Sequence, residues 1–138
     1  MSSVWLYWAL LAHMGLVVFI YLLLLRRKIA AGRAGEIDRK RTAVDPSAWP
    51  FSVQLVNNNL SSQFQIPVMV YACALALVQL DAVDVVGVAA IWAFVLLRIG
   101  HTAVHVTSNK VPYRMRFFTA GTVAAVVLMG RVGWALIG

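Results

Sequence analysis

A segment in the second half of the chain carries the residues best suited to chemistry. Arg98, His101, His105 and Asn109 follow one another at spacings of three, four and four residues. At about 100° per residue, this spacing places the four side chains on one face of a helix. Because they follow the apolar run 85–97, they are expected to lie at membrane depth, where charged groups need polar partners or water. The segment is therefore predicted to line a functional cavity.

Two kinds of chemistry fit this stripe from residue types alone. Arg98, together with Arg114 just beyond the stripe, could attract an anionic ligand through charge-assisted hydrogen bonds. His101 and His105, one helical turn apart, could instead chelate one metal ion or a haem iron. The second hypothesis lacks a neighbouring carboxylate or cysteine to complete the ligand shell, so no metal ligand is predicted.

The composition indicates the class of protein that must position these residues. Hydrophobic residues make up 62% of the 138-residue chain, charged residues make up 12%, and the mean hydropathy is +0.81. Soluble domains carry about 25% charged residues. The chain is therefore predicted to be an all-α, multi-pass membrane protein with one domain over residues 1–138 and membrane lipid as its surroundings.

The basic residues indicate an orientation. Seven of the twelve Lys and Arg residues lie between Arg26 and Arg41. Beside a membrane span, such a cluster is typical of a cytoplasmic loop under the positive-inside rule, so no nucleic-acid partner is predicted. The leader Met1-Ser-Ser-Val has no positive side chain, which argues against a cleaved signal peptide. Both termini are expected outside, with residues 26–50 and 110–116 in the cytoplasm.

Four transmembrane helices are predicted, at about residues 4–25, 52–80, 82–109 and 115–137. Gly32, Gly35, Asp45, Pro46 and Pro50 are expected to break regular structure in the first connection. The lone His13 in the first helix is interpreted as a hydrogen-bonding group that faces the bundle, in preference to a metal ligand.

The second helix is predicted to have one polar and small-residue face that packs against neighbouring helices. Its members follow a spacing of four and three residues: Asn58, Ser62, Gln65, Met69, Ala72, Ala76 and Gln79. Pro67 should leave the carbonyl of Gln63 without its helical donor and bend the helix. The polar groups at this bend support either a structural kink or a ligand pocket, and both interpretations stay open.

Two sequence patterns together resemble the MAPEG family, the membrane-associated proteins of eicosanoid and glutathione metabolism. The first is Asn59-Leu-Ser-Ser-Gln-Phe-Gln65-Ile-Pro67-Val-Met-Val-Tyr71, and the second is Arg98-x-x-His101-x-x-x-His105-x-x-x-Asn109-x-x-x-x-Arg114. The resemblance is closest to the bacterial branch and covers about residues 50–137, and the four-helix layout extends it to the whole chain. It implies a four-helix bundle assembled as a homotrimer, here in a bacterial inner membrane.

The resemblance also implies a function and a set of site residues. The enzymes of the family bind glutathione between subunits near the cytoplasmic side, where an arginine stabilises the thiolate. Arg114 is the predicted catalytic residue, and the predicted ligand-binding residues are Asn58, Asn59, Gln65, Tyr71, Arg98, His101, His105 and Asn109. The chain departs from the pattern at Gln65, where the bacterial branch usually has Glu.

Two functions follow as alternatives. One is a glutathione-dependent transferase or peroxidase that acts on hydrophobic substrates. The other is a non-catalytic protein on the same scaffold that binds a lipid or another small hydrophobic molecule.

Overall fold

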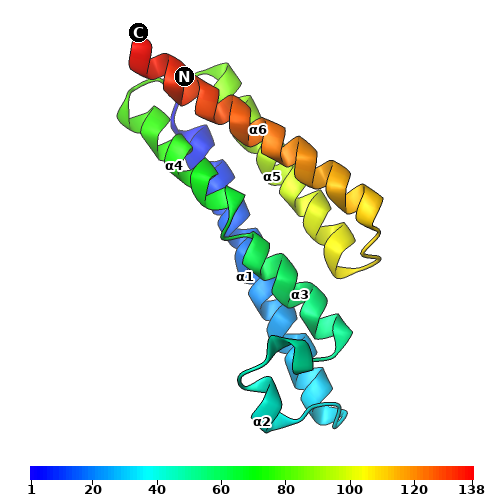
Figure 1. Ribbon diagram of the computed structural model, residues 1–138. Helices are drawn as coiled ribbons and strands as arrows, with labels where there is room; N and C mark the ends of the chain where they lie inside the picture. Colours follow the sequence, from blue (N-terminus) through cyan, green and yellow to red (C-terminus); the bar gives the residue numbers. More distant parts are fainter.

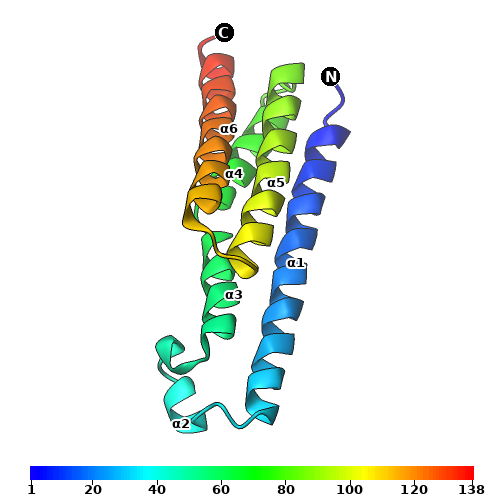
Figure 2. The ribbon, with the colours of Figure 1, turned by 90° about the vertical axis from the view of Figure 1, so that its right-hand side faces the viewer.

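The computed structural model describes all 138 residues and is entirely helical outside its turns. Four segments are long and apolar enough to cross a membrane: Val4–Arg33, Phe51–Gln79, Val85–Val106 and Val111–Ile137. The predicted all-α bundle of four membrane-spanning helices is confirmed. Both termini lie at one end of the molecule, and α2 (Arg39–Thr42) lies at the other (Figures 1 and 2).

The first helix, α1 (Val4–Arg33), continues eight residues beyond the predicted end at Leu25. Gly32 was expected to break it but lies within the helix. The break comes at Gly35, whose φ of 70° lies in the left-handed region that glycine adopts without strain. The amide of Gly35 donates to the Gly32 carbonyl, and the amide of Glu36 donates to the Ala31 carbonyl. This hydrogen-bond pair is the Schellman motif that terminates many helices.

The first connection contains two short helices, α2 and the 3-10 helix η1 (Pro46–Ala48). Asp38 caps α2, and its side chain accepts from the amides of Lys40 and Arg41. Asp45 caps η1 and accepts hydrogen bonds from the amide and the hydroxyl of Ser47 at 2.9 and 2.6 Å. These bonds stabilise the carboxylate and hold the pKa of Asp45 below its usual value.

The second span is two helices, α3 (Phe51–Ser62) and α4 (Ile66–Gln79), where one bent helix was predicted. The interruption over residues 63–65 has the predicted cause, because Pro67 has no amide hydrogen to donate. Pro67 lies in the first turn of α4, a position that tolerates proline because amides there have no helical acceptor. The break leaves the side chain of Gln63 buried in the bundle.

The third and fourth spans, α5 (Val85–Val106) and α6 (Val111–Ile137), lie side by side along their lengths. Asp84 caps α5 and accepts from the amide of Gly87 at 2.8 Å. The helix ends at Val106, so the prediction that Asn109 continues its stripe is wrong. Asn109 has a φ of 48°, and this left-handed residue turns the chain into α6.

The helices extend to different distances along the long axis of the bundle. α1 and α3 extend past the turn between α5 and α6 at the end that holds α2 (Figures 1 and 2). We call this end the basic end, because it contains the seven Lys and Arg residues between Arg26 and Arg41.

The apolar interior is divided into two clusters. The larger lies towards the termini and includes Leu6, Leu77, Ile91, Phe94 and Leu128. The smaller lies towards the basic end and consists of Ile20, Leu24, Ala31, Val53, Val56, Leu60 and Val106. On α1 and α5 the buried polar residues fall between these two sets, and on α3 they lie at its end, so a polar layer crosses the bundle.

Candidate functional site

The polar layer is built from α1, α5 and the end of α3. Its buried polar members are His13, Asn59, Gln63, Arg98, His101, Thr102 and His105. On α5 these residues occur at offsets of zero, three, four and seven, so one face of the helix carries them all. The predicted stripe is therefore present from Arg98 to His105.

Gln63 is the centre of the layer. Its Oε1 accepts from Arg98 Nε at 3.3 Å and lies 3.1 Å from Nε2 of His13. Its Nε2 donates to Oδ1 of Asn59 and to Oγ1 of Thr102, both at 3.2 Å. One amide side chain thus connects α1, α3 and α5.

The hydrogen-bond partners of His13 determine which of its two ring nitrogens carries the proton. Because Gln63 presents its oxygen, Nε2 of His13 must carry the proton and donate it. Nδ1 then accepts from the hydroxyl of Tyr71 at 2.6 Å. His13 faces the bundle as a hydrogen-bonding group, as interpreted from the sequence. Tyr71, a predicted ligand-binding residue, is bound to His13 and lies at the edge of the layer.

Arg98 is the only cation in the layer that stays charged at neutral pH. The residue is 3% exposed, and its Nη2 donates to Oγ of Ser62 at 2.8 Å. Its other side-chain bond goes to Gln63. The ion pairs of the chain are elsewhere, Arg41 with Asp45 and Arg131 with Asp84, so Arg98 has no carboxylate partner. A buried cation without a counter-ion is costly and favours the binding of an anion nearby.

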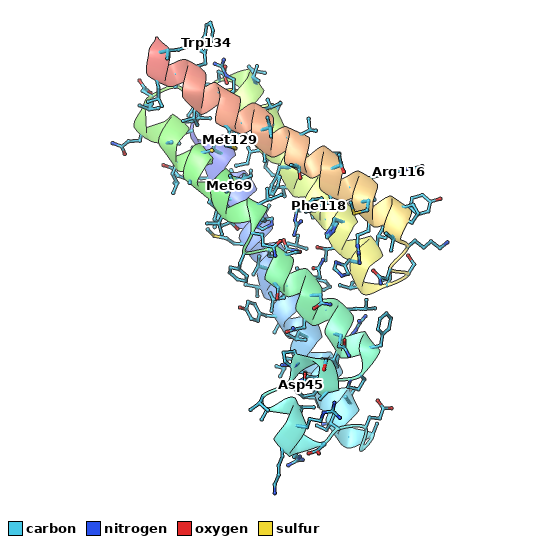
Figure 3. All side chains as sticks on the ribbon, in the orientation of Figure 1. Asp45, Met69, Arg116, Phe118, Met129 and Trp134 are labelled. Carbon is cyan, nitrogen blue, oxygen red and sulfur yellow. The ribbon has the colours of Figure 1, made fainter.

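The two histidines of the stripe have different surroundings. Nδ1 of His105 lies 3.3 Å from Nδ2 of Asn59, which donates to it. Nδ1 of His101 is buried without any partner. The two rings meet edge to face with their centroids 5.4 Å apart. His101 also lies beside Phe118 of α6, which is labelled in Figure 3. Nothing completes a metal shell around them, because no group of three His, Cys, Asp or Glu residues lies together.

The remaining predicted residues lie outside this layer. Arg114, in the first turn of α6, pairs with Asn109 in the turn before it, where Nη1 of Arg114 donates to Oδ1 of Asn109 at 2.7 Å. Asn58 and Gln65 are exposed on the outer surface of the single chain. The structure therefore brings Asn59, Arg98, His101 and His105 together but separates Asn58 and Gln65 from them.

Three residues of the layer, His13, Gln63 and Thr102, were not among the predicted site residues, and of these only His13 was interpreted as a hydrogen-bonding group of the bundle. Thr102 donates to Oδ1 of Asn59 at 3.2 Å, and its position four residues after Arg98 already placed it beside the stripe. Gln63 lies inside the sequence pattern around Pro67, but only its carbonyl was considered there. The central role of its side chain depends on the break after α3.

The comparison with known families agrees with this architecture. The model of the MAPEG family matches residues 4–134. The chain belongs to the MAPEG family. The match includes residues of all four spans and the whole polar layer of this MAPEG protein, in agreement with the resemblance, which the four-helix layout extended from residues 50–137 to the whole chain. No curated protein and no solved structure shows significant similarity to it.

Proposed function

We propose that this MAPEG protein is a glutathione-dependent transferase or peroxidase that acts on hydrophobic substrates from the membrane. The observation that carries the proposal is Arg98, a buried guanidinium in a polar layer that contains no acid. An anionic thiol peptide is a chemically suitable partner for such a site. Arg114, in the first turn of α6 at the same end of the bundle as the end of α5, is the second cation and the proposed catalytic residue.

The chemistry follows from the effect of a cation on a thiol. A cysteine thiol has a pKa of about 8.5, and a nearby guanidinium favours the thiolate. The thiol proton leaves to solvent, and the thiolate sulfur attacks an electrophilic carbon of the substrate. A carbon–sulfur bond forms, and the leaving group departs with the electron pair of the broken bond. Arg114 would stabilise the thiolate, while Arg98 would attract the carboxylates of glutathione.

Exposed polar side chains near the break between α3 and α4 support assembly of the protein with copies of itself. Asn58 and Gln65 are exposed there, together with Met69 and Ala72. These residues were predicted to pack against neighbouring helices, yet no helix of the same chain covers them. Polar groups facing lipid are costly, and small or polar residues favour helix association. We propose a homotrimer in which a neighbouring copy covers these residues, so that Asn58 and Gln65 can hold glutathione between subunits, while Asn59 stays buried in the polar layer of its own chain.

One observation favours the alternative of a non-catalytic binding protein. The guanidinium of Arg98 already donates hydrogen bonds to two acceptors of its own chain, Oε1 of Gln63 and Oγ of Ser62. A hydrogen-bond network that already provides acceptors for the Arg98 guanidinium could serve only to hold the helices together. The same scaffold would then bind a lipid or another hydrophobic molecule without using a thiol.

Calorimetric titration of glutathione into the detergent-solubilised protein tests the proposal, together with conjugation of glutathione to a chloronitrobenzene. Charge-assisted hydrogen bonds contribute about 1.5–3 kcal/mol each. We therefore expect Arg114→Ala to weaken binding or turnover about tenfold or more, and His105→Ala to weaken it less. Arg116→Ala is the matched control, because Arg116 lies exposed over the ring of Tyr113 near the start of α6 (Figure 3).

The outcomes separate the two functions. If the wild-type protein binds no glutathione at millimolar concentration, the proposed glutathione-dependent activity is refuted and the non-catalytic binding function is favoured. Equal losses in the Arg114 and Arg116 variants would show that only general positive charge matters. A stable monomer in light scattering would refute the trimer.

A further inference from the structure

The basic residues in the last third of α1 fall into two pairs. Nη1 and Nη2 of Arg27 donate to the carbonyls of Ser52 and Val106, both at 2.7 Å. The ammonium of Lys28 lies 4.9 Å from the centre of the Trp49 ring. These two cations therefore have partners inside the protein.

Arg26 and Arg33 make no side-chain hydrogen bond and no ion pair with any residue of the chain, and both are exposed. The acid closest along the chain to Arg33 is Glu36, and it lines a separate cavity beside Arg27. Two cations on α1 are thus left without a partner.

Both free cations line one groove on the outer surface of α1. The groove has a volume of about 430 Å³ and is lined by Leu22, Leu25, Arg26, Ile29, Ala30 and Arg33. At about 100° per residue these positions cluster on one side of the helix. Leu22 and Leu25 come first along the chain, Arg26 follows them, and Arg33 comes last after Ile29 and Ala30. The groove is therefore apolar on the side of the membrane core and cationic towards the basic end.

The depth of the groove matches the boundary of a bilayer. The apolar stretch Val4–Leu25 has 22 residues, which at 1.5 Å per residue makes about 33 Å of helix. A hydrocarbon core is about 30 Å thick, so Arg26 lies at its edge and Arg33 about 10 Å further out. Leu22 and Leu25 are 61% and 55% exposed at the depth of the acyl chains, and Ile29, 45% exposed, lies between the two arginines at the level of the headgroups.

From these observations we propose that this groove is a binding site for an acidic phospholipid. Arg26 and Arg33 hold its phosphate beside Ile29, and one acyl chain lies along Leu22 and Leu25. The site is separate from the polar layer, because the side chains that line the groove face outward from α1 and include none of the residues of that layer. Charge complementarity selects an anionic headgroup over a zwitterionic one. The apolar half selects a lipid over a free phosphate ester.

Native mass spectrometry of the solubilised full-length protein, titrated with phosphatidylglycerol or phosphatidylcholine, tests this proposal. Each basic residue near an anionic lipid surface contributes about fivefold in affinity. We expect the wild-type protein to prefer phosphatidylglycerol, and Arg26→Gln/Arg33→Gln to lower that affinity about 25-fold. Phosphatidylcholine binding should stay unchanged. Arg26→Lys/Arg33→Lys keeps both charges and should stay within about threefold of the wild type.

The matched control is Arg39→Gln/Arg41→Gln, which removes the same charge from α2 at the basic end and should change the affinity less than threefold. An equal loss in the two glutamine pairs would overturn the site in favour of diffuse attraction. The proposal also fails if the wild type does not distinguish the two lipids, or if glycerol 3-phosphate competes as well as the lipid does. Should the Arg26/Arg33 double variant not fold, each single variant is expected to show about a fivefold loss.

Discussion

Replacing the central glutamine of the polar layer tests whether one side chain holds three helices together. Gln63→Leu keeps a similar volume and removes four side-chain hydrogen bonds, those to His13, Asn59, Thr102 and Arg98. The substitution also leaves Arg98 buried with Ser62 as its remaining acceptor. We therefore expect the variant to be markedly less stable than the wild type.

The size of the effect follows from known side-chain hydrogen bonds between membrane helices. Such hydrogen bonds contribute about 0.6 kcal/mol each on average, which is less than the apolar surroundings of a membrane helix would lead one to expect. Three such bonds give about 2 kcal/mol, and the charge-assisted bond to Arg98 can add about 1.5 kcal/mol. The expected loss in the free energy of unfolding is thus about 2–4 kcal/mol.

Reversible unfolding in mixed micelles, followed by circular dichroism, measures this loss. Gln79→Leu is the matched control, because Gln79 is exposed at the end of α4 and its side chain makes no hydrogen bond. That variant should change stability by about 0.5 kcal/mol or less. The double variant His13→Leu/Gln63→Leu should lose less free energy of unfolding than the sum of the two single losses, because His13 and Gln63 are hydrogen-bonded to each other. Equal effects of Gln63→Leu and Gln79→Leu would refute the central role of Gln63.

Two further predictions concern helix packing and topology. A methyl group added at Gly100 would lie 2.5 Å from the ring of Phe117, whereas one at Gly130 would meet nothing within 4 Å. Gly100→Ala should therefore lower the free energy of unfolding by about 1–2 kcal/mol, while Gly130→Ala leaves it unchanged or raises it, and a reversed order would contradict this packing. In a cysteine-free background, cysteines at Ser3 and Gly32 should react with an impermeant reagent from opposite sides of the membrane. Labelling from the same side would overturn the predicted topology.

The positions of the membrane spans could be read from the sequence because they depend on local properties. A run of apolar residues long enough to cross the hydrocarbon core predicts a helix without knowledge of its neighbours. The same holds for the stripe from Arg98 to His105, since the pitch of one helix fixes which of its residues share a face. Asn109 departs from the stripe because its left-handed backbone ends the helix before it.

Only the tertiary structure decided which polar groups meet. The spacing of Asn58 and Gln65 defines one face only if the helix is continuous, and the break before Pro67 interrupts the helical phase between them. Helical periodicity also says nothing about which neighbour a face meets. The sequence therefore determined that Arg98 needs a polar partner at membrane depth. The choice of Gln63, a residue 35 positions away in the chain, depended on how α3 and α5 pack together.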